Sequence, residues 1–176
     1  MIVLLGPIGA GKSVQAQILV DNYGYKWIST GEMLRNTTDQ RVRDLLNSGQ
    51  LVDDKTVRDL LLQEISKTDV NQDIIIDGFP RRVSQADWLS EKAKDLKREV
   101  DHVLHVVLSE DTAAKRMEGR GRHDDSTEAM HARNKAYRDE VLPVINYYAK
   151  KDIVHEIDGA GTVEEVSKLI KDALGK

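Results

Sequence analysis

Five short apolar runs, separated by longer segments with helical patterns, constrain the fold of this chain most strongly. The runs lie at Ile2–Leu5, Lys26–Ser29, Asp73–Asp77, Val103–Leu108 and Ile153–Ile157. Most of them are too apolar for a strand that has one face in water, and such runs are typical of strands covered on both faces by helices. Their alternation with helical segments predicts a parallel α/β sheet.

The longer segments between the runs are predicted to be helices. We expect these helices at Lys12–Asn22, Asp54–Lys67, Ser84–Arg98, Asp111–Glu118, Thr127–Lys150 and Val163–Leu174. Pro143 is expected to kink the fifth of them, because proline removes a hydrogen bond from a helix interior. The stretch 30–49 contains short helical pieces broken by polar turns, which indicates a polar flap with room for a binding site.

Size and composition indicate one domain that binds small molecules. The chain has 176 residues, 32% of them charged, and a net charge of −4, which is unlike the strong basic bias of a nucleic-acid binder. The absence of cysteine excludes disulfides, thiolate zinc sites and cysteine nucleophiles, and it fits a reducing compartment. The apolar start is too short for a signal peptide, and no later run reaches membrane-spanning length. We therefore expect a cytoplasmic protein with no nucleic-acid or membrane partner.

A phosphate-binding motif lies between the first expected strand and the first expected helix. The segment Gly6–Ser13 satisfies the pattern G-x-x-x-x-G-K-[ST] in the strand-loop-helix context that the motif requires. Glycines let backbone N–H groups turn toward phosphate oxygens, the helix N-terminus adds partial positive charge, and Lys12 reaches the outer phosphates. Ser13 is placed to hold Mg²⁺ or a phosphate oxygen. The motif predicts a P-loop NTPase-type fold that binds a nucleotide.

The third expected strand ends in Asp77, in the manner of a Walker B segment. The run Ile74–Asp77 would place this carboxylate near the metal ion or its waters. An aspartate at the end of a strand is also common without any such role, so this residue alone leaves both interpretations open.

Four further segments narrow the identity of the phosphoryl acceptor. They are Ser29–Arg35, Asp77–Ala86, Arg120–Asp125 and Arg133, in that order along the chain. Together with the phosphate loop, they resemble adenylate kinase, and the resemblance continues through 143–148 to 157–159, nearly the whole chain. It implies a three-layer α/β/α fold with a five-stranded parallel sheet of order 2-3-1-4-5. It also implies Mg²⁺-dependent conversion of ATP and AMP to two ADP by a monomer.

The resemblance implies one P-loop kinase domain, 1–176, with an AMP-binding flap at 30–59 and a minimal lid at 119–125. The implied catalytic residues are Lys12, Arg81, Arg120, Arg122 and Arg133. The implied ATP site comprises Gly9, Ala10, Gly11, Lys12, Ser13, Val14, Arg116, Arg120 and Gly161. The implied AMP site comprises Thr30, Gly31, Arg35, Gln50, Leu51, Val52, Gly78, Phe79, Pro80, Arg81, Gln85, Arg122 and Arg133. Ser13, Asp77 and Asp124 are the candidate metal ligands, directly or through water, although a solvated acidic turn explains Asp124 equally well.

Physical reasons support these residue types. Two nucleotides bring many negative oxygens together, and a guanidinium is planar, always charged and able to grip phosphate through two parallel hydrogen bonds. Arg116 and Arg120 share one helix face because they are four residues apart, although a single exposed arginine such as Arg116 is often only a solvated charge. Gln85 has an amide that can donate to and accept from the adenine edge. Thr30 and Gln85 agree with AMP rather than UMP or CMP in the family pattern, while a surface position is the other explanation for Gln85.

The chain departs from the family pattern in three places. Only Gly121 separates Arg120 from Arg122, where relatives carry a lid. Val14 replaces the usual threonine of the phosphate loop, so Ser13 is the remaining hydroxyl, and Glu32 stands where aspartate is common. Two alternatives therefore stay open: a nucleotide-binding protein with impaired catalysis, and a P-loop kinase for another small acceptor.

Overall fold

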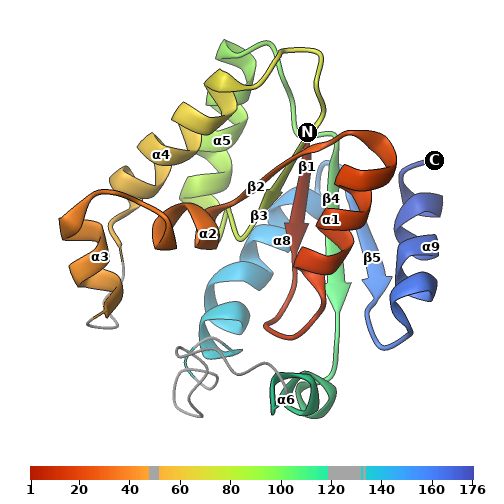
Figure 1. The fold of residues 1–176 in the computed structure, drawn as a ribbon. Helices are drawn as coiled ribbons and strands as arrows, with labels where there is room; N and C mark the ends of the chain where they lie inside the picture. Colours follow the sequence, from red (N-terminus) through yellow and green to blue (C-terminus); the bar gives the residue numbers. More distant parts are fainter. Residues whose placement is uncertain (48–51, 119–131, 133) are drawn as a thin grey trace.

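The computed structural model describes residues 1–47, 52–118, 132 and 134–176, and it contains a five-stranded parallel sheet (Figure 1). The strands are β1 (Ile2–Leu5), β2 (Lys26–Ser29), β3 (Ile74–Asp77), β4 (His102–Val107) and β5 (Val154–Asp158). Their order is β2-β3-β1-β4-β5. The predicted fold class and strand order are confirmed, and the expected strand boundaries differ from the observed ones by no more than one residue.

Helices follow each strand, as the sequence predicts. They are α1 (Lys12–Tyr23), α2 (Thr30–Arg35), α3 (Gln40–Asn47), α4 (Asp54–Lys67), α5 (Val83–Asp95), α6 (Glu110–Glu118), α8 (Leu142–Ala149) and α9 (Val163–Ala173). The short helices α2 and α3 occupy the stretch expected to form a flap, and they protrude beside β2 (Figure 1). Residues 127–131 and 133 of the fifth expected helix lie outside the described part of the chain.

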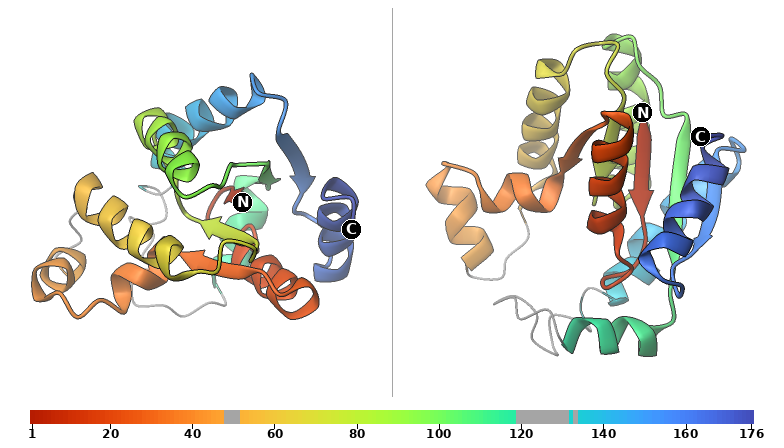
Figure 2. Two further views of the ribbon diagram at one scale, coloured as in Figure 1. Left: turned by 90° about the horizontal axis from the view of Figure 1, so that it is seen from above. Right: turned by 45° about the vertical axis from the view of Figure 1, so that its right-hand side comes forward.

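Two apolar layers cover the two faces of the sheet. Side chains alternate along β1, so that Val3 and Leu5 pack on one face with α4, α5 and α8, whereas Ile2 and Leu4 pack on the other with α1 and α9. Figure 2 shows α5 and α8 on the opposite side of the sheet from α1. This explains why the strands are apolar on both faces: a parallel sheet between two helical layers has no face in water.

A π-helical turn, η1 (Tyr137–Val141), immediately precedes α8, so Pro143 lies in the first turn of α8 rather than in the interior of one long helix. The Leu142 N–H donates to the carbonyl of Tyr137, five residues back. Proline has no N–H for an ordinary i→i−4 hydrogen bond. The wider π-helical turn changes the hydrogen-bond pattern from i→i−4 to i→i−5 at Leu142, immediately before Pro143. The same turn contains Tyr137, whose hydroxyl lies 2.6 Å from His105 Nε2 of β4. None of the helices in the described ranges is long and apolar enough to cross a bilayer.

Replacing Leu4 by alanine should destabilise the protein by about 2–5 kcal/mol, because Leu4 is fully buried in a central strand and its loss leaves a cavity. Denaturant unfolding measures this difference. Leu169→Ala is the matched control, since Leu169 on α9 is 42% exposed and its truncation should cost less than about 0.5 kcal/mol. Equal losses in the two variants would contradict the proposed core.

Candidate active site

Those residues singled out by sequence that the structure describes gather at one edge of the sheet, where the parallel strands end. The segments that follow β1, β2, β3 and β5 all start there, and α6 lies across the same end of the molecule (Figures 1 and 2). In open α/β sheets the carboxyl ends of the strands form the ligand-binding crevice. The fold therefore brings together segments that are far apart in sequence.

Close backbone approaches shape the phosphate loop after β1. A Cβ atom on Gly6 would lie 2.4 Å from the carbonyl oxygen of Val106 in β4, so only glycine fits there. Gly11 has a left-handed conformation (φ 80°) and precedes α1, and no described side chain caps the start of that helix. A helix N-terminus that opens from a glycine loop presents N–H groups and partial positive charge, which together suit a phosphate group.

Lys12, Ser13 and Asp77 place charged and hydroxyl groups beside this loop. Lys12 Nζ donates to the carbonyl oxygens of Gly6 and Pro7, at 2.8 and 2.7 Å. Ser13 Oγ lies 3.4 Å from Asp77 Oδ2. Burial raises the pKa of the Asp77 carboxyl, and Lys12 and Ser13 oppose that shift. A buried carboxylate with a cation and a hydroxyl beside it is the setting expected for a functional group rather than a solvated strand end.

A second cluster forms at the ends of β2 and β3. The Thr30 hydroxyl donates to the Asp77 carbonyl at 3.1 Å. A Cβ on Gly78 would lie 2.8 Å from Thr30 Oγ1 and 3.7 Å from an Arg81 guanidinium nitrogen, and Gly78 has φ 82°. Arg81 is exposed, and its Nε donates to the Gly78 carbonyl at 3.0 Å. The glycine thus allows a hydroxyl and a guanidinium to converge. Arg35 is also exposed, with its guanidinium close to Gly31.

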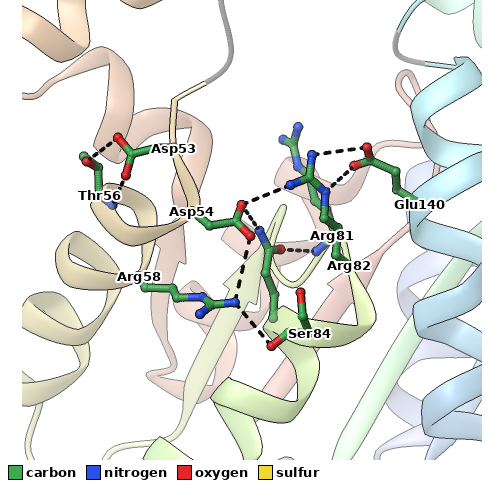
Figure 3. Close-up of polar contacts among 9 residues, drawn as sticks. Asp53, Asp54, Thr56, Arg58, Arg81, Arg82, Ser84 and Glu140 are labelled. Carbon is green, nitrogen blue, oxygen red and sulfur yellow. Dashed lines mark hydrogen bonds and ion pairs between the residues drawn. The ribbon is translucent and has the colours of Figure 1, made fainter.

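The Gln85 side chain is buried at the start of α5, with 5% of the residue exposed. Its Oε1 accepts from the backbone N–H of Arg81 at 2.7 Å, and its Nε2 donates to Asp54 Oδ1 at 2.9 Å. The interpretation of Gln85 as a simple surface residue of the helix is therefore wrong. Figure 3 shows Asp54 in a polar network with Arg58 and Arg82, and Glu140 on the far side of Arg82.

The phosphate loop also contacts α6. A Cβ on Gly9 would lie 2.9 Å from the Ala113 carbonyl oxygen, so α6 packs directly on the loop. Arg116 of α6 donates to the carbonyl oxygens of Ala160 and Gly161, each at 3.3 Å. The structure thus brings together Arg116 and Gly161, the two residues predicted separately to contact the ATP base.

The remaining predicted residues fall into two groups, those outside the described part of the chain and those within it. Gln50, Leu51, Arg120, Arg122, Asp124 and Arg133 lie outside the described residues, as does the expected lid at 119–125. Of the other predicted residues, Val52 is half-buried, Phe79 and Pro80 are buried, and Val14 is 49% exposed at the start of α1. Among the described residues, no group of three or more His, Cys, Asp or Glu side chains could hold a metal ion.

Sequence reasoning missed three features of the site. Asp54 bonds to Gln85 across 31 positions, and Arg82 pairs with Glu140 across 58. Ala113 packs against the phosphate loop. Of these features, only the Arg82–Glu140 pair has a signal in the sequence, and it is weak: Arg82 directly follows the predicted Arg81. The partners of Arg82 could not be predicted because charged residues are frequent everywhere on this surface.

Comparison with known proteins identifies the family of the chain. The adenylate kinase family model matches residues 4–153. An adenylate kinase from Rhodococcus erythropolis is 39% identical, with 99% of each chain covered. One from Mycolicibacterium paratuberculosis is 38% identical over 99% of each chain, and adenylate kinase 1 from Nostoc is 34% identical over 99% of this chain and 98% of its own. This chain belongs to the adenylate kinase family. It is therefore a phosphotransferase of the nucleoside monophosphate kinase type.

Asp77→Asn should stabilise this adenylate kinase family member at neutral pH while impairing its catalysis. Burial raises the folded-state pKa of Asp77 above the ordinary value of 3.8, so ionisation at neutral pH opposes folding. This cost appears as pH rises from about 3.8 through the raised pKa and persists above it. The gain in the melting temperature of the variant should be largest at pH 7–8 and shrink toward pH 4. A constant gain at every pH would contradict the assignment of the effect to burial of the charge.

Proposed function

We propose that the chain catalyses the reversible conversion of ATP and AMP to two ADP, with Mg²⁺ as cofactor. The main support is the pairing of β1 with β3, in register at Leu4 and Asp77, which sets the phosphate loop beside the Thr30–Gly78–Arg81 cluster. The phosphate loop and this cluster lie at neighbouring strand ends, and two adjacent groups of phosphate-binding residues suit two nucleotides whose phosphates meet. The names of the relatives support adenine nucleotides on both sides.

The proposed mechanism is direct in-line transfer. A phosphate oxygen of AMP forms a bond to the γ-phosphorus of ATP, the bond from that phosphorus to the β–γ bridging oxygen breaks, and the bridging oxygen leaves with the first ADP. Such a transfer needs alignment and charge stabilisation rather than a nucleophilic side chain. Lys12 supplies positive charge from the phosphate loop and Arg81 from the end of β3. Charged phosphate oxygens are stronger hydrogen-bond acceptors than the neutral carbonyl oxygens that Lys12 contacts. When ATP binds, the Lys12 ammonium would therefore leave the carbonyl oxygens and donate to the phosphate oxygens.

The described residues fit a magnesium ion bound together with ATP. Ser13 Oγ and Asp77 Oδ2, 3.4 Å apart, are hard oxygen donors beside the phosphate loop. Mg²⁺ usually keeps several waters and binds through one or two protein oxygens plus phosphate, so a larger acidic cluster is not required. When bound there, the ion would neutralise phosphate charge.

We further propose the division of the site that the resemblance implies. Arg116 and Gly161 would contact the ATP base, whereas Thr30, Arg35, Arg81 and Gln85 would hold AMP, with 30–59 as its flap and 119–125 as a minimal lid. Arg120, Arg122 and Arg133 would attend the transferring group. We propose a cytoplasmic setting, with which the complete lack of cysteine is compatible. We also propose that the protein is a monomer.

A coupled assay of ATP with AMP, GMP, UMP or CMP, with Mg²⁺ present or chelated, tests the reaction. We expect AMP to exceed the pyrimidine nucleotides by at least roughly a hundredfold in kcat/KM, because a buried amide discriminates through hydrogen bonds that the wrong base leaves unmade. Chelation should abolish turnover. Binding of ATP and AMP without ADP production would instead indicate impaired catalysis, and a preference for another acceptor would indicate a different kinase.

Lys12→Ala and Arg81→Ala should each reduce kcat by on the order of 10³ or more, by analogy with other cations that stabilise phosphoryl transfer. Initial rates of ADP formation at saturating ATP and AMP measure the loss. Lys92→Ala is the matched control, because Lys92 lies on the surface of α5 and pairs with Asp95. Its activity should match that of the unmodified protein. Unchanged activity in either site variant, with an unchanged melting temperature, would refute the assignment.

A further inference from the structure

We propose that Asp54 fixes the direction of the Gln85 carboxamide and thereby makes the acceptor site select a 6-aminopurine over a 6-oxopurine nucleotide. The inference rests on the proposed function, in which Gln85 recognises the acceptor base. Asp54 would act as a positioning residue through Gln85, without contact to the nucleotide.

The two hydrogen bonds of Gln85 have fixed polarity. The backbone N–H of Arg81 can only donate, and it lies 2.7 Å from Oε1. The carboxylate of Asp54 can only accept, and its Oδ1 lies 2.9 Å from Nε2. Turning the amide over would set its NH₂ group against an N–H and its oxygen against a carboxylate. With only 5% of the residue exposed, water could not compensate for those contacts. Both neighbours therefore hold the amide in one of its two orientations.

The amide keeps hydrogen-bonding capacity for a ligand. A carboxamide has two acceptor lone pairs and two N–H donors, and the protein contacts use one of each. One lone pair and one N–H remain, in a spatial order set by the fixed orientation. The Watson–Crick edge of a 6-aminopurine donates at the amine and accepts at N1, whereas a 6-oxopurine accepts at the oxygen and donates at N1. A freely turning amide could match either edge, but a fixed amide matches only one.

Asp54 is itself held in place by cations from two elements. Arg82 Nη1 lies 3.4 Å from the same Oδ1, and Arg58 Nη2 lies 3.9 Å from Oδ2. Arg82 is anchored in turn by two contacts of 3.3 Å to Glu140 of η1, and Arg58 lies over the ring of Trp88 at 5.5 Å. Figure 3 shows these arginines on two sides of Asp54. The carboxylate cannot readily swing away from Gln85 without leaving both cations.

Asp54 does not serve as the cap of α4, because its neighbour does. The Asp53 side chain accepts from the Thr56 backbone N–H at 3.0 Å and from the Thr56 hydroxyl at 2.8 Å (Figure 3). The two adjacent aspartates therefore have different roles: Asp53 stabilises the start of α4, whereas Asp54 accepts the hydrogen bond from Gln85. This separation supplies a matched pair of variants.

The test compares kcat/KM for AMP and for IMP in the unmodified protein and in Asp54→Ala, Asp53→Ala and Gln85→Ala. In Asp54→Ala we expect the IMP-to-AMP ratio to rise by about tenfold, mainly through KM, since about one hydrogen bond no longer opposes amide reversal. In Asp53→Ala the ratio should stay within about twofold although the melting temperature falls. The isosteric Asp54→Asn, which can donate or accept, should give an intermediate ratio.

The outcomes separate this inference from the proposed function. If Gln85→Ala changes the ratio but Asp54→Ala does not, Asp54 has no positioning role and the inference is overturned while base recognition by Gln85 stands. If Gln85→Ala leaves the ratio unchanged, Gln85 does not recognise the base, and the inference fails with that assignment. Should Asp54→Ala be too unstable for kinetics, calorimetric titration of the unmodified protein and of Asp54→Asn with AMP and with IMP gives the ratio of the two dissociation constants. A ratio that Asp54→Asn leaves unchanged also overturns the proposal.

Discussion

The burial of β1 and β3 between two helical layers is the constraint on which the rest of the structure depends. These strands have no face in water, so their register is fixed by packing on both sides, and Leu4 stands opposite Asp77. Their carboxyl ends then emerge together at one edge of the sheet. The phosphate loop and the Arg81 segment, some 70 residues apart in sequence, meet there because the strands before them cannot slide.

The same constraint explains how much of the fold the sequence predicts. Apolar runs on both faces and helical segments between them specify a parallel sheet, and the phosphate-loop motif locates the first strand-to-helix turn. The observed β4 begins one residue before the predicted strand and β5 ends one residue after it. The residues added, His102 and Asp158, are polar yet pair in the sheet through their backbones. Pro143 signalled a disturbance in its helix, but the π-helical form of that disturbance depends on local hydrogen bonding that composition does not encode.

The candidate site was predictable where motifs carry it and not where tertiary contacts do. Lys12 and Ser13 stand at the spacing that the phosphate-loop motif fixes, and Thr30, Arg81 and Gln85 lie in segments that resemble adenylate kinase, so sequence alone could name these residues as candidates. The bonds from Asp54 to Gln85 and from Arg82 to Glu140 join elements whose relative position is known only once the helices are packed. Acidic and basic side chains are abundant in this chain, so no spacing distinguishes these particular partners.

The site combines a rigid polar floor with exposed cations, and this combination has a physical reason. Asp77 and Gln85 are buried, where each bond is strong and each unpaired group is costly, so their orientations are fixed before a ligand arrives. Arg35, Arg81 and Arg116 are exposed, where a guanidinium keeps its hydration and can turn toward phosphate or base. Burying those cations as well would impose a desolvation cost on the folded protein. In the reaction proposed above, base selectivity would therefore come from the buried amide, and charge stabilisation from exposed side chains that can turn toward the phosphates.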